Sequence, residues 1–165
     1  MAPVLLGCEA PLRAVAGDGA QAMDVRAGPS RQSGARWAAR GAAAFCAAFA
    51  GLQIALAAGA PLGEVVWGGS SAVLPAPMRL ASAGAAAYLA LASAALLARA
   101  GDWGRQLPAA PFRWFAGFLT LQLALNTAAN LAARSPVERY GMGAASALGA
   151  LLCLAAFIGP SRRRD

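Results

Sequence analysis

Residues 112–158 read FRWFAGFLTLQLALNTAANLAARSPVERYGMGAASALGALLCLAAFI, two long apolar runs separated by Arg134 and Ser135. A helix needs about 20 mostly apolar residues to cross a bilayer, and both runs, 112–133 and 136–158, reach that length. A serine, a proline and a glutamate at the start of the second run form a capping box, which predicts a helix beginning there. The stretch is therefore predicted to be a tight hairpin of two membrane-spanning helices.

Two further apolar runs, 37–58 and 80–98, lie earlier in the chain, and neither has a charged residue at its centre. Arg99 followed by Gly101 is typical of a helix C-terminus, so the second span is predicted to end there. With 59% hydrophobic and 13% charged residues, the chain lies outside the composition of soluble globular proteins. The sequence predicts an all-α fold, an integral membrane antiparallel four-helix bundle over residues 36–159.

The two ends of the chain lie outside this predicted bundle. Residues 1–35 are rich in Ala, Gly and Arg without a sustained period, which predicts a disordered basic N-terminal segment. Residues 160–165 are predicted to be a basic C-terminal tail. The sequence leaves open whether Met1 or Met23 is the true start.

The arginines predict the orientation in the membrane, since they supply all 14 basic residues. Eleven fall in the N-terminal segment, the second loop and the C-terminus, and three fall in the first and third loops. An excess of positive charge marks the cytoplasmic side, so a multi-pass protein of the cell (plasma) membrane with both termini in the cytoplasm is predicted. The lipid bilayer then explains the net charge of +7 better than nucleic acid does.

Residues that commonly carry catalysis are sparse in this sequence. Histidine is absent, and Cys46 and Cys153 fall inside predicted spans without a CxxC or metal-ligand spacing. We therefore predict no catalytic residue, no metal and no cofactor.

Amide side chains provide the polar chemistry inside the predicted spans. Gln122, Asn126 and Asn130 follow one another at four-residue spacing, on one face of the third helix, and Gln53 can face them from the first. Amides are costly in hydrocarbon, so this face is expected to point inward. Two interpretations stay open: hydrogen bonds between helices, which we favour, and a polar cavity that opens outward and binds a small ligand.

Small residues also recur at four-residue spacing, which lets membrane helices approach closely. They occur in three spans: Ala43, Ala47, Gly51, Ala55 and Gly59 in the first, Ser82, Ala86, Ala90, Ala94 and Ala98 in the second, and Gly141, Ala145 and Gly149 in the fourth.

The first loop, 59–79, is expected to be a short structured outer loop. Two glycines after Trp67 suit a two-residue turn, which predicts a small hairpin. A lid over the bundle is the interpretation we favour; the other is a binding site formed by Glu64 and Trp67. The candidate residues of this outer face are Glu64, Trp67, Arg79, Arg134, Glu138 and Arg139.

Several strings in the chain resemble a family of small bacterial four-span integral membrane proteins. The strings are AGAPLGEVVWGG, LPAPMRLASA, LLARAG and NTAANLAARSPVERYGMGAASAL, within residues 45–158. The residues that match the two loop motifs are Gly59, Pro61, Gly63, Glu64, Trp67, Gly68, Gly69, Asn130, Ser135, Glu138 and Arg139. Ala133 stands where the family more often has serine. The resemblance implies the four-span architecture and no particular activity.

Two function classes remain open. One is a non-enzymatic accessory protein or a binder of a lipid or small molecule, acting alone, as a homo-oligomer or with a membrane partner protein. The other is a small transporter acting as an oligomer. Four-span multidrug exporters carry a carboxylate in the first span, and residues 37–58 contain none, so we favour the first class.

Overall fold

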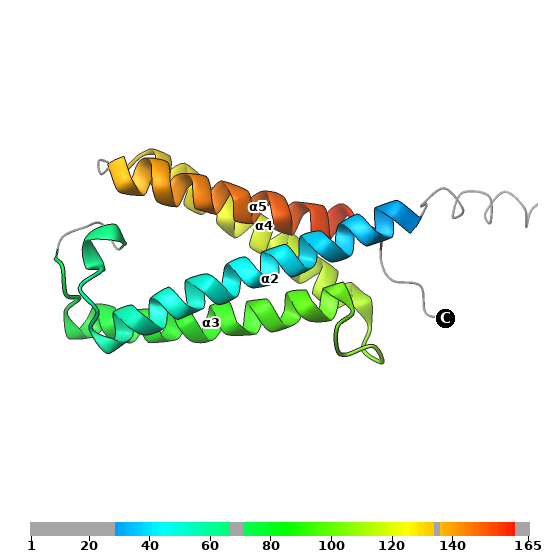
Figure 1. Ribbon diagram of the computed structural model, residues 1–165, viewed down its shortest axis with the longest axis horizontal. Helices are drawn as coiled ribbons and strands as arrows, with labels where there is room; N and C mark the ends of the chain where they lie inside the picture. Colours follow the sequence, from blue (N-terminus) through cyan, green and yellow to red (C-terminus); the bar gives the residue numbers. More distant parts are fainter. Residues whose placement is uncertain (1–28, 67–70, 134–135, 161–165) are drawn as a thin grey trace, which may run out of the picture.

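A computed structural model of the protein describes residues 29–66, 71–133 and 136–160, and within them the fold is all-helical, as predicted (Figure 1). Two short segments of other helix types accompany four α-helices: a 3-10 turn, η1, in the first loop, and a π-helical segment, η3, directly before α5. The elements are α2 (Pro29–Ala58), η1 (Gly63–Val65), α3 (Ala76–Ala100), α4 (Ala109–Leu131), η3 (Val137–Met142) and α5 (Gly143–Ile158). The described residues contain no strand.

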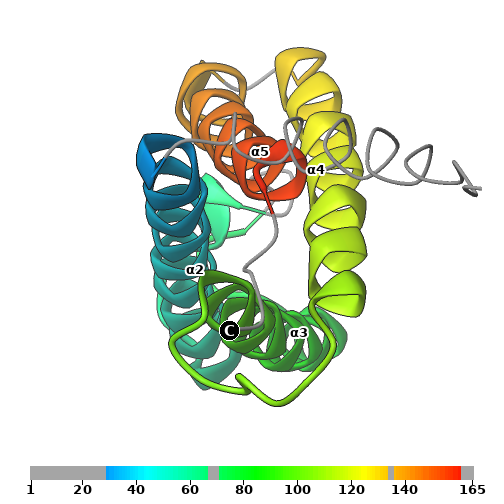
Figure 2. The same ribbon diagram turned by 90° about the vertical axis from the view of Figure 1, so that its right-hand side faces the viewer.

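The helices form two close pairs, α2 with α3 and α4 with α5, and α2 also contacts α5. At one end α2 begins, α3 ends, α4 begins and α5 ends; we call it the arginine end (Figure 1). The opposite end, which carries the loop over residues 59–75, we call the loop end. Figure 2 looks onto the arginine end and shows α2, α5, α4 and α3 following one another around the molecule.

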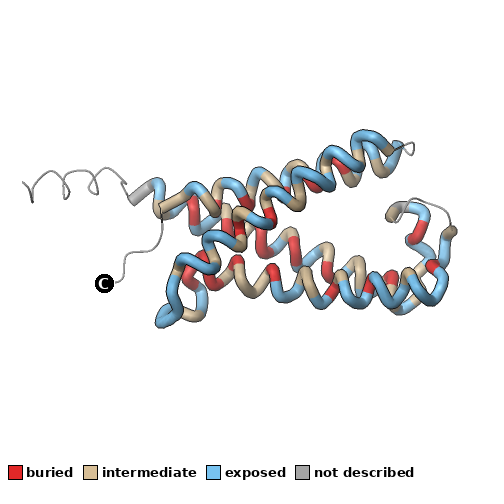
Figure 3. Tube along the Cα trace, turned by 180° about the vertical axis from the view of Figure 1, so that it is seen from behind, coloured by how far each residue is buried: buried red, intermediate tan, exposed pale blue. Residues whose placement is uncertain are grey.

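The core lies mostly in the half next to the arginine end. Toward the loop end the two helix pairs diverge, while most of the core positions lie where the four helices are close (Figure 3). Small side chains dominate the core, which permits close approach of the helix backbones. The core residues are Ala39, Ala42, Ala43, Cys46, Ala92, Leu96, Ala100, Ala116, Leu119, Cys153 and Ala156.

The first helix begins earlier than the sequence predicts. It starts at Pro29, so residues 29–35 belong to α2 and not to the N-terminal tail. Ala35 and Ala39 are buried on its inner face, and Arg36 Nε donates to the carbonyl of Ala100, 3.2 Å away. These contacts with the rest of the molecule hold a segment whose composition alone does not favour a helix. The predicted disorder of residues 1–28 lies outside the described residues, as does most of the C-terminal tail.

The predicted end of the second helix is confirmed. Gly101 adopts φ 86°, in the left-handed region that glycine enters without a steric penalty. Its N–H donates to the carbonyls of Leu97 and Ala98, and the Asp102 N–H also donates to Leu97. This hydrogen-bonded C-terminus occupies carbonyls that would otherwise lack a partner.

The predicted hairpin in the first loop is wrong for the part of the loop that is described. Residues Gly63–Val65 form the 3-10 turn η1, and the Gly63 N–H donates across the loop to the Ala72 carbonyl at 2.8 Å. A Cβ at Gly63 would clash with the backbone carbonyl of Ser71, so the close approach requires glycine. Residues 67–70, which would have formed the turn, lie outside the described ranges.

The predicted stripes of small residues mark the helix contacts only in part. A Cβ at Gly149 would lie 2.7 Å from the ring of Phe45, so this glycine admits a neighbouring helix. Gly51 and Gly141 face open space, with nothing within 4 Å of an added Cβ. In a chain so rich in alanine, four-residue spacing therefore does not identify the packed face.

Three helical stretches are long and apolar enough to cross a membrane: Arg31–Ala58, Ala76–Ala100 and Val137–Ile158. The sequence predicts four spans, and α4, with 23 residues, is not among the three. Its three amide side chains lower its hydropathy. The predicted capping box before α5 depends on Ser135, which lies outside the described residues; the segment that follows Pro136 is the π-helix η3.

Candidate functional site

A cavity of about 400 Å³ lies between the four helices toward the loop end. All four amide residues singled out in the sequence line it: Gln53, Gln122, Asn126 and Asn130. The structure thus brings together residues from α2 and α4 that are about 70 positions apart in the chain. Val66 of the first loop also contributes to the wall.

The rest of the cavity wall is mostly apolar. Phe45 and Phe49 of α2 stack in a tilted arrangement with ring centroids 4.6 Å apart, and both line the cavity. Leu119 and Leu123 of α4 lie on the same wall. The described residues that line the cavity are all uncharged, so the site presents apolar surface with a few amide and hydroxyl groups.

Two of the amides form hydrogen bonds to other helices. The Tyr88 hydroxyl of α3 donates to Gln122 Oε1 at 2.5 Å. Asn130 Nδ2 donates to Ser146 Oγ of α5 at 3.2 Å, and Ser146 in turn donates to the Met142 carbonyl at 2.8 Å. These bonds agree with the interpretation that the amides fix the helices relative to one another.

The other two amides have polar atoms free for a ligand. Gln53 Oε1 is buried and has no hydrogen-bond partner in the described structure. Asn126 is exposed on the cavity side of α4 and makes no hydrogen bond within the described ranges. An unpaired buried carbonyl oxygen costs about 1–3 kcal/mol, so a donor that entered the cavity would find a favourable partner. Hydrogen bonding between helices therefore accounts for Gln122 and Asn130, whereas Gln53 and Asn126 fit the interpretation of a cavity that binds a ligand.

Tyr88 is a polar contact of this site that the sequence analysis missed. Its phenol reaches Gln122 only because α3 lies next to α4 along the cavity. The available signal was the presence of a hydroxyl-bearing aromatic in the middle of a predicted span, since a buried tyrosine usually finds a hydrogen-bond partner.

The candidate residues of the outer loop do not join this cavity. Glu64 is exposed on η1 and makes no ion pair within the described ranges. Arg79 Nε donates to the Ala57 carbonyl at 2.9 Å, so this cation occupies the C-terminus of α2 and does not pair with Glu64. Trp67 and Arg134 lie outside the described residues.

Glu138 and Arg139 lie on η3, beside the junction between α4 and α5. Glu138 is half-buried and Arg139 is exposed, and neither lines the cavity. Within the described residues, no group of three or more His, Cys, Asp or Glu is placed to hold a metal ion.

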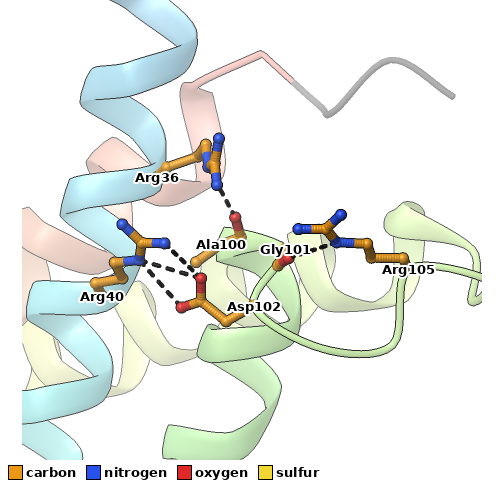
Figure 4. Close-up of polar contacts among 6 residues, drawn as sticks. All are labelled: Arg36, Arg40, Ala100, Gly101, Asp102 and Arg105. Carbon is orange, nitrogen blue, oxygen red and sulfur yellow. Dashed lines mark hydrogen bonds and ion pairs between the residues drawn. The ribbon is translucent and has the colours of Figure 1, made fainter. Parts of the chain in front are cut away.

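The arginine end carries a second concentration of polar contacts, which the sequence analysis used only as an orientation signal. Arg40 of α2 pairs with Asp102, just beyond α3, at 2.5 Å, and Arg105 Nε donates to the Gly101 carbonyl at 3.3 Å (Figure 4). Hydrogen bonding from Arg40 lowers the pKa of Asp102 below its ordinary value. Arg113 of α4 donates to the Phe157 carbonyl at 3.1 Å. These bonds join α2 to the end of α3 and α4 to α5 at this end.

Comparison with known proteins found no matching family model, no matching curated protein and no matching solved structure. The resemblance to small four-span membrane proteins therefore stays a prediction from the sequence.

Proposed function

We propose that the protein is a non-enzymatic, multi-pass protein of the plasma membrane that binds a small uncharged molecule in the polar cavity. The four helices would form a membrane-embedded antiparallel bundle, with the arginine end in the cytoplasm and the loop end outside. The observation that carries the binding proposal is the buried, unpaired Gln53 Oε1 in a cavity lined by three further amides.

Membrane insertion is supported by the outward faces of the helices. Large apolar side chains project from all four, including Ile54 of α2 (60% exposed), Leu80 of α3 (75%), Leu125 of α4 (63%) and Leu151 of α5 (63%). A soluble monomer rarely exposes apolar patches of this extent, whereas lipid tails would cover them. Trp37, Trp103, Trp114 and Tyr140 are also exposed near helix ends, where aromatic side chains occupy membrane interfaces.

The fourth span would be α4, although its mean hydropathy is lower than that of the other three helical stretches. Its 23 residues give a length of about 34 Å at 1.5 Å per residue, which matches a hydrocarbon core of about 30 Å. The amides that lower its hydropathy line the cavity, while Phe118, Leu121 and Leu125 are exposed on the outside. A helix of this kind is apolar toward lipid and polar toward its neighbours.

The chemistry of the cavity favours an uncharged ligand. The wall combines the rings of Phe45, Phe49 and Tyr88 with amides and offers no counter-charge among its described residues. Entry of an ion would leave its charge poorly solvated. A small molecule with one apolar face and one N–H or O–H donor directed at Gln53 would satisfy both parts of the wall. This ligand class fits a binding or accessory protein, and we favour it over the transporter alternative.

Cysteine labelling tests the cavity and the membrane together. Native Cys8, Cys46 and Cys153 are first replaced, and single cysteines are placed at Asn126 and Asn130. A membrane-impermeant maleimide added outside whole cells should label both. Leu125→Cys, on the same helix but 63% exposed on the outer face, is the matched control and should stay unlabelled because it faces lipid. Labelling at 125 would refute membrane insertion of α4, and protection of 126 and 130 would refute an open cavity.

Retention of a ligand is the direct test of binding. The protein purified with native lipids and examined by native mass spectrometry should carry an uncharged small molecule that Gln53→Met releases. Gln106→Met changes an exposed glutamine of the α3–α4 connection in the same way and should retain the ligand. Equal retention by both variants would remove Gln53 from the site.

The orientation is tested with a topology reporter. The 11-to-3 asymmetry of arginines predicts cytoplasmic activity for a reporter fused after Arg164 and external activity for one inserted at Ser70. The reverse pattern would place the cavity on the cytoplasmic side.

A further inference from the structure

A second cavity, of about 280 Å³, lies at the arginine end between the start of α2 and the end of α3. Three arginines line it, Arg36, Arg40 and Arg99, together with Trp37. Asp102 pairs with Arg40, so positive charge remains in excess around this space (Figure 4). None of these residues belongs to the polar cavity of the proposed function.

The guanidinium of Arg99 is the most constrained group of the three. The residue is only 6% exposed, and its Nη2 donates to the carbonyls of Gly159 at 2.9 Å and Pro160 at 3.4 Å. Its Nε is buried and has no partner among the described residues. Burial of a guanidinium with an unused donor is unfavourable unless an acceptor, best a negatively charged one, lies beside it.

The other two arginines also have donors to offer. Arg36 uses Nε for the Ala100 carbonyl at 3.2 Å, and this is the one bond it makes to described residues, so its Nη donors remain free. Arg40 engages Asp102 through Nε and Nη2 and lies over the Trp37 ring, 5.0 Å from its centroid. Several N–H groups with fixed geometry thus surround one space.

We infer that this cavity binds a phosphate group that carries net negative charge. Guanidinium groups bind phosphate through paired N–H donors, and phosphate has enough acceptor oxygens to engage more than one arginine at once. Trp37, at 65% exposure, stands at the rim in the position of an interfacial aromatic. The phosphate could belong to the headgroup of an anionic phospholipid or to a soluble anion, and the two sources share this chemistry.

The test uses the full chain in a phosphate-free maltoside detergent, with thermal unfolding followed as each probe is added. The probes are dioleoylphosphatidylglycerol, dioleoylphosphatidylcholine and inorganic pyrophosphate. A saturable rise in Tm with phosphatidylglycerol alone assigns a lipid headgroup, and a rise with pyrophosphate assigns a soluble anion. Phosphatidylcholine, whose choline cancels the charge, should have little effect.

Two substitutions give the matched comparison. Arg36→Gln and Arg113→Gln each remove one positive charge and one bond from Nε to a carbonyl near a helix C-terminus, but only Arg36 lines the cavity. Arg36→Gln should weaken binding on the order of tenfold, the effect of losing a charged hydrogen bond, and Arg113→Gln should leave it near the wild-type value. Arg36→Lys keeps the positive charge but lacks the planar guanidinium with its paired N–H donors, so it should also bind phosphate more weakly.

Three results would overturn the inference. One is the absence of any rise in Tm with phosphatidylglycerol or pyrophosphate. Another is a rise with phosphatidylcholine as large as that with phosphatidylglycerol. The last is an equal weakening of binding by Arg36→Gln and Arg113→Gln. If Arg36→Gln does not fold, binding by Arg36→Lys as tight as that of the wild type has the same meaning.

Discussion

At the arginine end the four helices lie close together around small side chains, and guanidinium groups donate to backbone carbonyls where α3 and α5 end. At the loop end the helix pairs diverge, and amides and aromatic rings line a cavity (Figure 1). The difference is one of side-chain size as well as of polarity. Alanine dominates the core near the arginine end, whereas the rings of Phe45, Phe49 and Tyr88 line the cavity.

This contrast shows how a small helical protein can combine stability with an open site. The arginine end provides most of the buried contacts, so the loop end can tolerate an unsatisfied group such as Gln53 Oε1. Most buried polar groups in folded proteins have a hydrogen-bond partner, so the unpaired Gln53 oxygen is an exception.

The largest difference is expected for truncation of leucines. Leu96 is fully buried in the core, so Leu96→Ala should lower the free energy of unfolding by about 2–4 kcal/mol through loss of packing. Leu123 lines the cavity and already lacks neighbours on that side, so Leu123→Ala should cost only about 1 kcal/mol. Both are measured by SDS titration in mixed micelles. Equal losses would mean that the loop end is packed as tightly as the arginine end.

A smaller effect, of opposite sign, is expected at Gln53. In protein freed of ligand, Gln53→Met removes a buried unpaired oxygen and should raise the free energy of unfolding by about 1 kcal/mol. Gln122→Met is the control: it deprives the Tyr88 hydroxyl of its acceptor, so it should lower the same quantity by a similar amount. Destabilisation by both variants would show that Gln53 has a partner in the folded protein.

The smallest effect is expected at the ion pair of Arg40 and Asp102. Arg40 lowers the pKa of Asp102, so the ion pair stabilises the folded protein fully at pH values above the ordinary aspartate pKa of about 3.9. This stabilisation is lost as the pH falls through the lowered pKa of Asp102 in the folded protein. The pair lies at the surface, so this contribution should be smaller than the effects of the leucine and glutamine substitutions.

The contribution of the Arg40–Asp102 ion pair is measured as the difference in unfolding midpoint between the wild type and Asp102→Asn. The two should differ at pH 7 and converge as the pH falls below the lowered pKa of Asp102. Glu64→Gln alters an exposed carboxylate without an ion pair in the described structure and should match wild type at both pH values. A difference between wild type and Asp102→Asn that does not change with pH would remove the ion pair as its cause.

The helices could be predicted from the sequence because the length of an apolar run and the residues of a turn are local signals. Gly101 ends α3 as predicted, and the expected spans overlap all four α-helices. The early start of α2 could not be predicted from local sequence, because residues 29–35 are helical where they pack against residues far along the chain, as Ala35 does against Gly159.

The spacing of Gln122, Asn126 and Asn130 indicated that one face of α4 is polar, and all three line the cavity. Which amide pairs and which stays unpaired depends on how the helices are rotated and how far they diverge. The bond from Tyr88 to Gln122 joins two helices whose relative rotation no local pattern records. The same reason explains why Gly149 contacts Phe45 while Gly51 faces open space.

Five arginines share one property: each donates to a main-chain carbonyl. The pairs are Arg36 with Ala100, Arg79 with Ala57, Arg99 with Gly159, Arg105 with Gly101 and Arg113 with Phe157. Every residue type supplies a carbonyl, so the acceptor position can change its side chain and keep the bond, whereas the donor position must keep a side chain of sufficient length with an N–H group. Sequence drift should therefore be one-sided at Ala57, Ala100 and Phe157, whose side chains can change while the arginines are retained. Gly101 and Gly159 are constrained for other reasons, the first by its left-handed backbone and the second by the close approach of Ala35.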